Sequence, residues 1–298
     1  MTLRDKIKSD KFVVCGETSP PISADGQILR KKTRHFRSGV DAVNITDNQT
    51  ATVRLSSIAS AKILIEEGLE PIMQMTCRDR NRIGMQSDLL GAAAMGIQNV
   101  LCLTGDHQQF GDQPEARGVF DLDSVQLVAT VKLMNEGQLL SGQELKVPTN
   151  FLIGAAANPF AEPFEMRLIR LHKKVEAGAD FIQTQPVFDL NLFSRWMEGL
   201  VKMNLHESCA ILAGIMPVRS VKALEYMKSS VPGMKIDESY IQRMQEAEDP
   251  KAEGLLIAVE LVNELRKISG IRGIHIMPTG WESITPVLLS EAGLTNSD

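Results

Sequence analysis

Residues 99–106 read Asn-Val-Leu-Cys-Leu-Thr-Gly-Asp, a short apolar run that ends in a hydroxyl, a glycine and a carboxylate. An apolar run without alternation is typical of a parallel strand that is covered on both faces in an α/β protein. Such folds place their ligands at the carboxyl ends of the strands, where Gly105 and Asp106 lie in this run. We therefore expect a strand here, followed by a turn that contacts a ligand.

The same unit recurs along the chain, with strand starts about every 30 residues, the length of one βα unit. Segments with helical periodicity separate the strands, and several of them stop at a glycine that can end a helix, at positions 39, 68, 96 and 178. Strict alternation implies parallel strands with right-handed crossovers. Eight units without a GxGxxG or Walker motif favour one (β/α)8 barrel domain over residues 1–298 rather than an open sheet. The expected strands are 12–17, 42–47, 71–77, 99–106, 150–156, 181–185, 210–216 and 271–277, and the expected helices are 28–39, 52–68, 83–96, 124–137, 162–178, 190–204, 220–230 and 252–268.

Two intervals are longer than the repeat. A polar, glycine-containing loop, 107–123, follows the fourth strand, and an extra helix over about 237–248 precedes the eighth. We expect these insertions to shape a substrate pocket. Residues 281–292 are expected to form a closing helix.

Composition excludes several classes of function. A net charge of −5 over 298 residues is not typical of a nucleic-acid-binding surface. No apolar run approaches the roughly 20 residues of a membrane helix, and the N-terminus lacks the core of a signal peptide, so we expect a cytoplasmic protein. The four cysteines are scattered, which predicts no metal or iron–sulfur site in this chain, and Cys15, Cys77 and Cys102 fall within expected strands, which predicts buried free thiols.

The residues expected at the barrel mouth are mainly carboxamides, hydroxyls and isolated acids. They include no cluster suited to a catalytic metal and no Ser–His or Cys–His pair. Such a rim suits a flat heteroaromatic ligand such as a flavin or a pterin, with the chemistry supplied by the cofactor. The set is Glu17, Thr46, Asp47, Asn48, Gln74, Thr76, Thr104, Gly105, Asp106, Asn158, Gln185 and Thr279.

Several of these candidates have two interpretations. Glu17, before two prolines that end its strand, is either a proton donor or half of an ion pair at the barrel rim. Asp106 either contacts a ligand or caps a turn. Gln183 and Gln185 point to the same side of their strand, and two inward glutamines are costly unless a ligand pairs with them. The charged stretch 77–82 is typical of a solvated loop, and Lys174 of a surface lysine.

Over residues 3–294 the chain resembles the methylenetetrahydrofolate reductase family, and within it the short bacterial form of acetogens, which works with partner subunits. The resemblance rests on the order and spacing of several segments around the barrel. They are Gly16-Glu-Thr-Ser-Pro-Pro, Val43-Asn-Ile-Thr-Asp-Asn, Gln74-Met-Thr-Cys-Arg-Asp-Arg-Asn, Leu103-Thr-Gly-Asp, Gly154-Ala-Ala-Ala-Asn-Pro and Lys173-Lys-Val-Glu-Ala-Gly-Ala-Asp-Phe-Ile-Gln-Thr-Gln-Pro.

This resemblance implies a flavin-dependent barrel that interconverts 5,10-methylenetetrahydrofolate and 5-methyltetrahydrofolate. It implies that Glu17 is the general acid that opens the ring to a 5-iminium cation, to which flavin N5 delivers hydride. Asp106 is then expected to favour positive charge on the pterin. The implied substrate contacts are Asp106, Gln183, Gln185 and Trp281, and the implied flavin contacts are Thr46, Gln74, Thr104, Gly105, Asp106, Phe120, Asn158, Arg170 and Lys174.

The chain also departs from the family pattern. Val221 stands where an aromatic packs on nicotinamide, which leads to the hypothesis that a partner subunit with iron–sulfur or zinc sites supplies the electrons. Arg167 and Arg170 replace an acid and an amide, so FMN joins FAD as a candidate. Gln74 replaces a histidine, and Trp281 lies near an expected arginine, where it is suited to stacking on the aminobenzoyl ring.

Two alternatives remain open from the sequence. One is a folate-dependent methyltransferase barrel without flavin. The other is a non-catalytic subunit of a redox complex. Bound flavin distinguishes the reductase from both.

Overall fold

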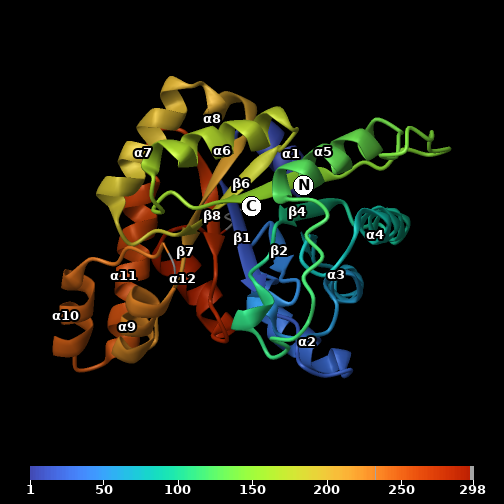
Figure 1. Ribbon diagram of the computed structural model, residues 1–298. Helices are drawn as coiled ribbons and strands as arrows, with labels where there is room; N and C mark the ends of the chain where they lie inside the picture. Colours follow the sequence, from blue (N-terminus) through green and yellow to red (C-terminus); the bar gives the residue numbers. More distant parts are fainter. Residues whose placement is uncertain (232, 296–298) are drawn as a thin grey trace.

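Eight parallel strands close into a barrel, in the order of the sequence, in the computed structural model of the chain (Figure 1). The structure describes residues 1–231 and 233–295. Each strand pairs with the next, and the last pairs with the first, so the expected (β/α)8 barrel is confirmed. The strands are β1 (Val13–Thr18), β2 (Ala42–Ile45), β3 (Pro71–Thr76), β4 (Asn99–Leu103), β5 (Leu152–Ala157), β6 (Phe181–Pro186), β7 (Ala210–Ile215) and β8 (Ile271–Ile276).

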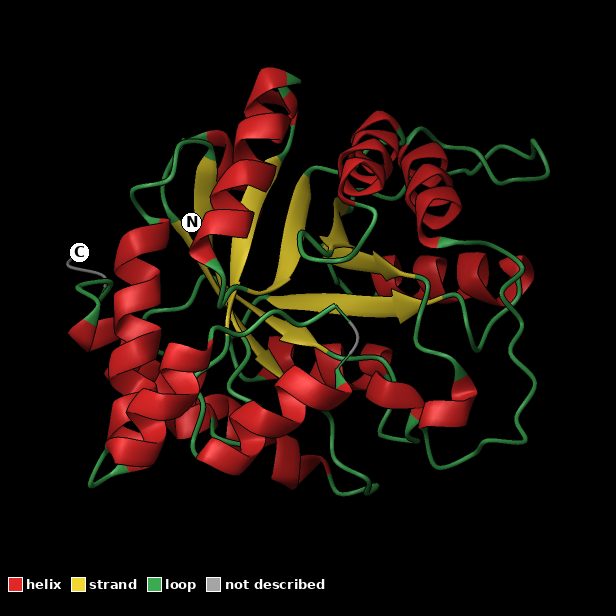
Figure 2. Ribbon diagram, turned by 60° about the vertical axis from the view of Figure 1, so that its left-hand side comes forward, coloured by secondary structure: helices red, strands yellow, loops and turns green. Residues whose placement is uncertain are grey.

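Helices surround the strands on all sides (Figure 2). The α-helices are α1 (Leu3–Lys8), α2 (Gly26–Thr33), α3 (Ser57–Glu66), α4 (Arg82–Ala94), α5 (Ser124–Asn135), α6 (Phe164–Glu176), α7 (Leu190–Lys202), α8 (Leu205–Ser208), α9 (Val221–Ser230), α10 (Glu238–Glu246), α11 (Pro250–Leu265) and α12 (Thr285–Glu291). Short 3-10 turns are η1 (Arg34–Phe36), η2 (Gln49–Ala51), η3 (Gln108–Phe110) and η4 (Glu282–Ile284).

The predicted elements exist, but several of their ends differ. β4 stops at Leu103, because Gly105 turns the chain with φ +93°. The helix expected from residue 52 begins only at Ser57, where the Ser56 hydroxyl accepts a hydrogen bond from the Ala59 N–H. The helix expected over 28–39 ends at Thr33 and continues as η1, and the closing helix divides into η4 and α12. The glycines expected to end helices, at 39, 68, 96 and 178, all have positive φ.

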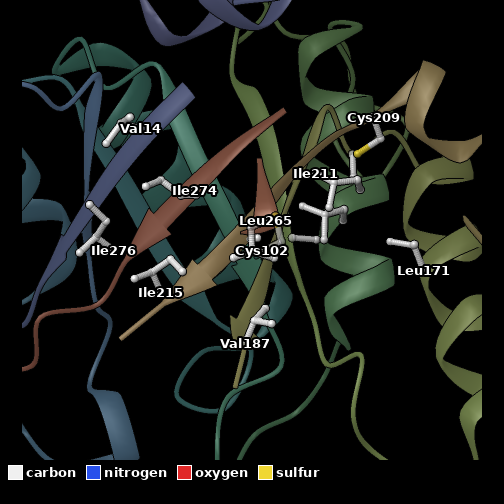
Figure 3. Close-up of a cluster of buried hydrophobic side chains, with 14 of the residues drawn as sticks. Val14, Cys102, Leu171, Val187, Cys209, Ile211, Ile215, Leu265, Ile274 and Ile276 are labelled. Atoms are coloured by element: carbon white, nitrogen blue, oxygen red, sulfur yellow. The ribbon is translucent and has the colours of Figure 1, made fainter. Parts of the chain in front are cut away.

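Alternation along the strands creates two apolar layers. Outward-facing side chains pack against the helices, and Figure 3 shows part of that cluster, in which Val14, Ile274 and Leu265 come from β1, β8 and α11. Inward-facing side chains fill the amino-terminal end of the barrel, which Leu3 of α1 closes. The inner cluster comprises Leu3, Val13, Cys15, Ala42, Ile72, Leu101, Leu152, Phe181, Ala210 and Leu212.

The barrel is packed at one end and polar at the other. On β1 the inward position changes from Cys15 to Glu17, and on β6 it changes from Phe181 to Gln183. Space for Phe181 comes from Gly154 on the neighbouring strand, where a Cβ would lie 2.2 Å from the Phe181 ring. The apolar layers therefore support a polar site at the carboxyl ends of the strands.

The two insertions do not line that site, contrary to expectation. The 107–123 loop lies against the loop after β3, where the Val119 N–H donates to the Arg78 carbonyl at 2.8 Å. Helix α10 contacts α9 and α11. None of the residues 107–122, and none of α10, lines the mouth cavity within the described part of the chain. The 107–123 loop instead holds the loop after β3, which carries the lining residue Arg78.

The cysteines are free and buried, as expected. Desolvation raises the pKa of Cys77 to about 12, and it also raises the pKa values of Cys15, Cys102 and Cys209. These thiols therefore behave as small apolar side chains rather than as nucleophiles. In the described residues, no helix combines the length and the apolar character that crossing a membrane requires.

Candidate functional site

A cavity of about 290 Å³ opens at the carboxyl ends of the strands. All the residues expected at the mouth line it except Asn158 and Thr279. The lining residues are Glu17, Thr46, Asp47, Asn48, Gln49, Gln74, Thr76, Arg78, Leu101, Leu103, Thr104, Gly105, Asp106, Ala156, Gln183, Thr184, Gln185, His275 and Met277.

Glu17 lies in this cavity with two nitrogen partners on one carboxylate oxygen. Gln74 Nε2 donates to Glu17 Oε2 at 3.0 Å, and His275 Nε2 lies 3.2 Å from the same oxygen. If Glu17 forms an ion pair at the rim, its partner is His275, which also lines the cavity. Gln74, predicted as a flavin contact, lies beside the candidate acid.

Several buried polar atoms in the cavity have no protein partner. Both amide atoms of Gln183 and the Thr46 hydroxyl are buried and unpaired. Leaving such a group unpaired costs about 1–3 kcal/mol. Gln185 lines the same cavity and is exposed, so the two glutamines face one side as expected. These atoms are suited to hydrogen bonds with a ligand that has donors and acceptors of its own.

Thr104, Gly105 and Asp106 follow β4 directly and line the cavity. The Thr104 hydroxyl accepts from the Ser124 N–H at 3.1 Å, which ties the turn to the start of α5. That helix is capped by Asp123, so Asp106 does not serve as its cap. The exposed Asp106 carboxylate therefore remains open to a ligand.

The charged stretch 77–82 is only partly the solvated loop that we expected, since Asp79, Asn81 and Arg82 are exposed but Arg78 is not. Arg78 is only 2% exposed. Its guanidinium donates to the carbonyls of Asp106 at 3.1 Å and Asn48 at 3.0 Å, and pairs with Asp79. Because those carbonyls belong to the loops after β4 and β2, Arg78 fixes the two loops relative to each other.

Arg80 in the same stretch pairs with Asp47. Asp47 also accepts from the Thr76 N–H at 2.9 Å, from the Thr76 hydroxyl at 3.0 Å and from the Ser57 hydroxyl at 3.3 Å. Both oxygens of Asp47 are thereby engaged. This aspartate holds β2 and β3 together and is not free for chemistry.

A second pocket of about 190 Å³ adjoins the cavity and shares Ala156 and Gln185 with it. It is cationic, because Arg167, Arg170 and Lys174 line it together with Asn158. The Arg167 Nε atom is buried without a partner. Such a pocket fits a phosphate group.

Lys174 is not a surface lysine, contrary to expectation, since it is only 9% exposed. Its ammonium group donates to the Ala156 carbonyl at 2.6 Å. Desolvation, together with the charge of Arg170, lowers the pKa of Lys174 to about 8. An anion in the pocket would favour the charged form.

Two predicted contacts lie outside both pockets. Trp281 is buried, with the Lys251 ammonium 5.1 Å from the centre of its ring. Phe120 is exposed, and its N–H donates to the Cys77 carbonyl at 3.1 Å. Neither side chain is brought to Glu17 by the fold.

The sequence interpretation missed His275 and Asn44, which contact each other beneath Glu17. A signal was present in the strand pattern. Because side chains alternate between the two faces of a strand, Gly273, His275 and Met277 on and after β8 share the inward face, as Cys15 and Glu17 do on β1. A polar residue at an inward position near a strand end is a candidate for the site.

Comparison with known proteins identifies the family. Residues 2–293 match the model of the methylenetetrahydrofolate reductase family. The methylenetetrahydrofolate reductase (NADH) 1 of Arabidopsis thaliana is 26% identical over 310 residues, which cover 99% of this chain and 51% of that protein. The 5,10-methylenetetrahydrofolate reductase of Pectobacterium carotovorum subsp. carotovorum is 25% identical, covering 70% of this chain and 64% of that protein. The chain spans about half the length of the plant relatives that it matches.

Solved structures share the architecture at low sequence identity. A Clostridium thermocellum protein described as binding two copies of 5-methyl-5,6,7,8-tetrahydrofolic acid superposes with a TM-score of 0.68 at 15% identity, over 98% of both chains. A 2,3-dimethylmalate lyase gives 0.51 at 13% identity, over 97% of this chain and 82% of the lyase. These likenesses establish the barrel fold, and the family model establishes the lineage. The chain therefore belongs to the methylenetetrahydrofolate reductase family.

Proposed function

We propose that this chain catalyses the flavin-dependent reduction of 5,10-methylenetetrahydrofolate to 5-methyltetrahydrofolate, as an oxidoreductase acting on a CH–NH group. The observation that carries the proposal is the mouth cavity, in which Glu17 lies among unpaired amide and hydroxyl atoms. Membership of the family supports the same reaction.

In this reaction Glu17 acts as the general acid. It gives a proton to the bridged substrate, so that the five-membered ring opens to a 5-iminium cation. The cavity wall supports this role, because Gln74 and His275 remain as hydrogen-bond partners of the carboxylate that forms. General acid catalysis contributes typically 10²–10⁴-fold to a rate.

The pterin is held by Gln183, Gln185 and Asp106. The unpaired amide of Gln183 and the exposed amide of Gln185 offer both donors and acceptors on one side of β6. The Asp106 carboxylate stabilises positive charge as the cation forms. From the resemblance alone, we also propose that Trp281 contacts the folate.

A flavin fits the remaining groups. Its ring system would lie against Thr46, Gln74 and the turn Thr104–Gly105–Asp106, where the Thr46 hydroxyl has no protein partner. Asn158, Arg170 and Lys174 would hold a phosphate in the cationic pocket. The bound flavin supplies the hydride. The resemblance alone adds Phe120 as a contact.

The cofactor is FAD by family resemblance, with FMN as the alternative. The alternative is supported by the cationic pocket, where Arg167 and Arg170 replace an acid and an amide. A single terminal phosphate would find three cations within this one pocket.

We further propose that residues 1–298 act as one flavin-binding domain in the cytoplasm, and that a partner subunit with iron–sulfur or zinc sites delivers the electrons. Val221, the first residue of α9, replaces the aromatic that would stack on nicotinamide. Among the described residues, no group of His, Cys, Asp and Glu side chains can hold a metal ion. The electron carrier is therefore sought outside this chain.

Reconstitution tests the proposal. The purified chain is loaded with FMN or with FAD, the bound flavin is reduced with dithionite without oxygen, and 5,10-methylenetetrahydrofolate is added. We expect a yellow protein whose reduced flavin is reoxidised with formation of 5-methyltetrahydrofolate. A colourless preparation that binds neither flavin contradicts the proposal and favours a folate-dependent methyltransferase or a non-catalytic subunit.

A further inference from the structure

The two oxygens of the Glu17 carboxylate have different surroundings. Oε2 lies 3.0 Å from Gln74 Nε2 and 3.2 Å from His275 Nε2. Oε1 has no hydrogen-bond partner among the described residues, although Glu17 lines the cavity. One oxygen is thus held by the protein, and the other is left for a ligand.

Asn44 determines how His275 carries its proton. Asn44 Nδ2 lies 3.3 Å from the Gly16 carbonyl oxygen and 3.2 Å from His275 Nδ1. A carbonyl only accepts hydrogen bonds, so the NH₂ end of the amide faces both atoms. His275 Nδ1 is then an acceptor, and the proton of the neutral imidazole is on Nε2, directed at Glu17.

The opposite orientation of the Asn44 amide is unfavourable. It would set Oδ1 of Asn44 against the Gly16 carbonyl, two acceptors in contact without a hydrogen between them. Asn44 is fully buried and His275 is 3% exposed, so water does not relieve that contact. Oδ1 has no partner in the observed orientation and Nδ2 would have none at that position in the opposite one, so the contact between the two acceptors decides between them. The fold therefore selects one tautomer of His275.

We propose that His275 is a positioning residue that, fixed by Asn44 as the Nε2–H tautomer, occupies Oε2 of Glu17 together with Gln74 and so directs the transferable proton to Oε1. This inference rests on the proposed function of Glu17 as the general acid. In the step itself, the Oε1–H bond breaks and a substrate N–H bond forms. The ring C–N bond breaks with its electron pair passing to nitrogen, and the carboxylate left behind keeps both N–H donors on Oε2.

The other charged side chains that line the cavity have separate partners or positions. Asp47 is paired with Arg80, Arg78 is paired with Asp79, and Asp106 lies at the exposed rim after β4. His275 is accordingly the titratable group in contact with Glu17. Its removal is expected to change proton donation without removing the acid itself.

Two variants of His275 separate donation from packing. His275→Leu removes the N–H donor and keeps an apolar side chain, whereas His275→Gln returns an amide N–H near the position of Nε2. With pre-reduced flavin and 5,10-methylenetetrahydrofolate, at a pH on the acidic plateau of the rate, we expect His275→Leu to lower the single-turnover rate about tenfold or more, the effect of losing one hydrogen bond to a charged group. We expect His275→Gln to restore most of the rate.

The pH profile gives a second readout. A donor on Oε2 favours the carboxylate over the acid, so its loss makes Glu17 a weaker acid that stays protonated to higher pH. The pH at which the rate is half of its plateau should therefore rise by about one pH unit in His275→Leu and stay near the wild-type value in His275→Gln. His35→Leu, an exposed histidine in η1, is the control and should match the wild type.

A readout without turnover uses the wild-type chain free of flavin and folate. Nitrogen-15 NMR of labelled histidine distinguishes the two neutral tautomers, and the signal lost in His275→Gln identifies His275 among the five histidines. We expect the Nε2–H tautomer in the wild type and a mixture in Asn44→Leu.

Three results would overturn the inference: an Nδ1–H tautomer of His275, a His275→Leu variant with the wild-type rate and pH profile, or equal losses in the Leu and Gln variants, which indicate packing alone. If the wild type fails to convert the substrate, the proposed function fails. The tautomer experiment still decides the assignment made from Asn44.

Discussion

Three carboxylates line the mouth cavity, and their surroundings give them different roles. Asp47 accepts hydrogen bonds from Arg80, Thr76 and Ser57, so it is committed to the structure. Asp106 lies exposed at the rim, and Glu17 keeps one oxygen without a partner. Only Glu17 and Asp106 are therefore available to a bound molecule, one deep in the cavity and one at its edge.

Lys174 gives a prediction for phosphate recognition. Its pKa is lowered to about 8, so its ammonium is present below that pH and is lost as the pH rises through it. The FMN phosphate is already a dianion there, because its second pKa is about 6. We expect the affinity for FMN, measured by flavin fluorescence, to fall about tenfold between about pH 7 and 9.

Lys174→Met should bind FMN weakly at neutral pH and without this pH dependence. Lys173→Met removes the neighbouring exposed lysine and should retain the pH dependence of FMN affinity. A Lys174→Met variant with the same decline in affinity as the wild type would rule out Lys174 as its source.

At the scale of elements, α11 lies unusually close to the loop after β7. A Cβ at Gly254, in the first turns of α11, would lie 1.8 Å from the Val218 carbonyl oxygen. Gly91 in α4 has no atom within 4 Å of the corresponding position and is exposed. Replacing glycine by alanine should therefore lower the stability of the protein at position 254 and raise it at position 91.

Chemical denaturation measures both effects. Gly254→Ala forces α11 away from the barrel and should lower the free energy of unfolding by about 1–3 kcal/mol. Gly91→Ala should raise it by about 0.5–1 kcal/mol, because alanine loses less backbone entropy than glycine in a helix. Equal effects in the two variants would contradict the close approach of α11 to Val218.

Hydrophobic periodicity predicted the strands and helices well, because the pattern of apolar residues in a segment depends on which of its own faces are buried. The eight strands and the turn at Gly105 followed from apolar runs and their spacing. Arg78 and Lys174 were misjudged for a different reason. Besides the pair of Arg78 with Asp79, these side chains donate to backbone carbonyls of loops and strands elsewhere in the chain, and the sequence does not show where a carbonyl will lie.

At the scale of the whole molecule, we propose that the electrons reach the flavin from a partner subunit, so that the complete electron path belongs to an assembly larger than this barrel. Val221 at the start of α9 offers no aromatic ring to a nicotinamide.

A direct prediction follows for the isolated chain. Flavin bound to it should stay oxidised when NADH or NADPH is added without oxygen, and it should be reduced by dithionite. The absorbance of the bound flavin measures both steps. Rapid bleaching by a pyridine nucleotide alone would show that no partner is needed.

The central claim is that Glu17 protonates a folate in the barrel mouth, and Glu17→Gln tests it most directly. The variant keeps the size of the side chain and removes the acid. In a single turnover with pre-reduced flavin and 5,10-methylenetetrahydrofolate, we predict a loss of about a hundredfold or more in rate, with flavin and 5-methyltetrahydrofolate still bound. Formation of 5-methyltetrahydrofolate by Glu17→Gln at the wild-type rate would contradict the account.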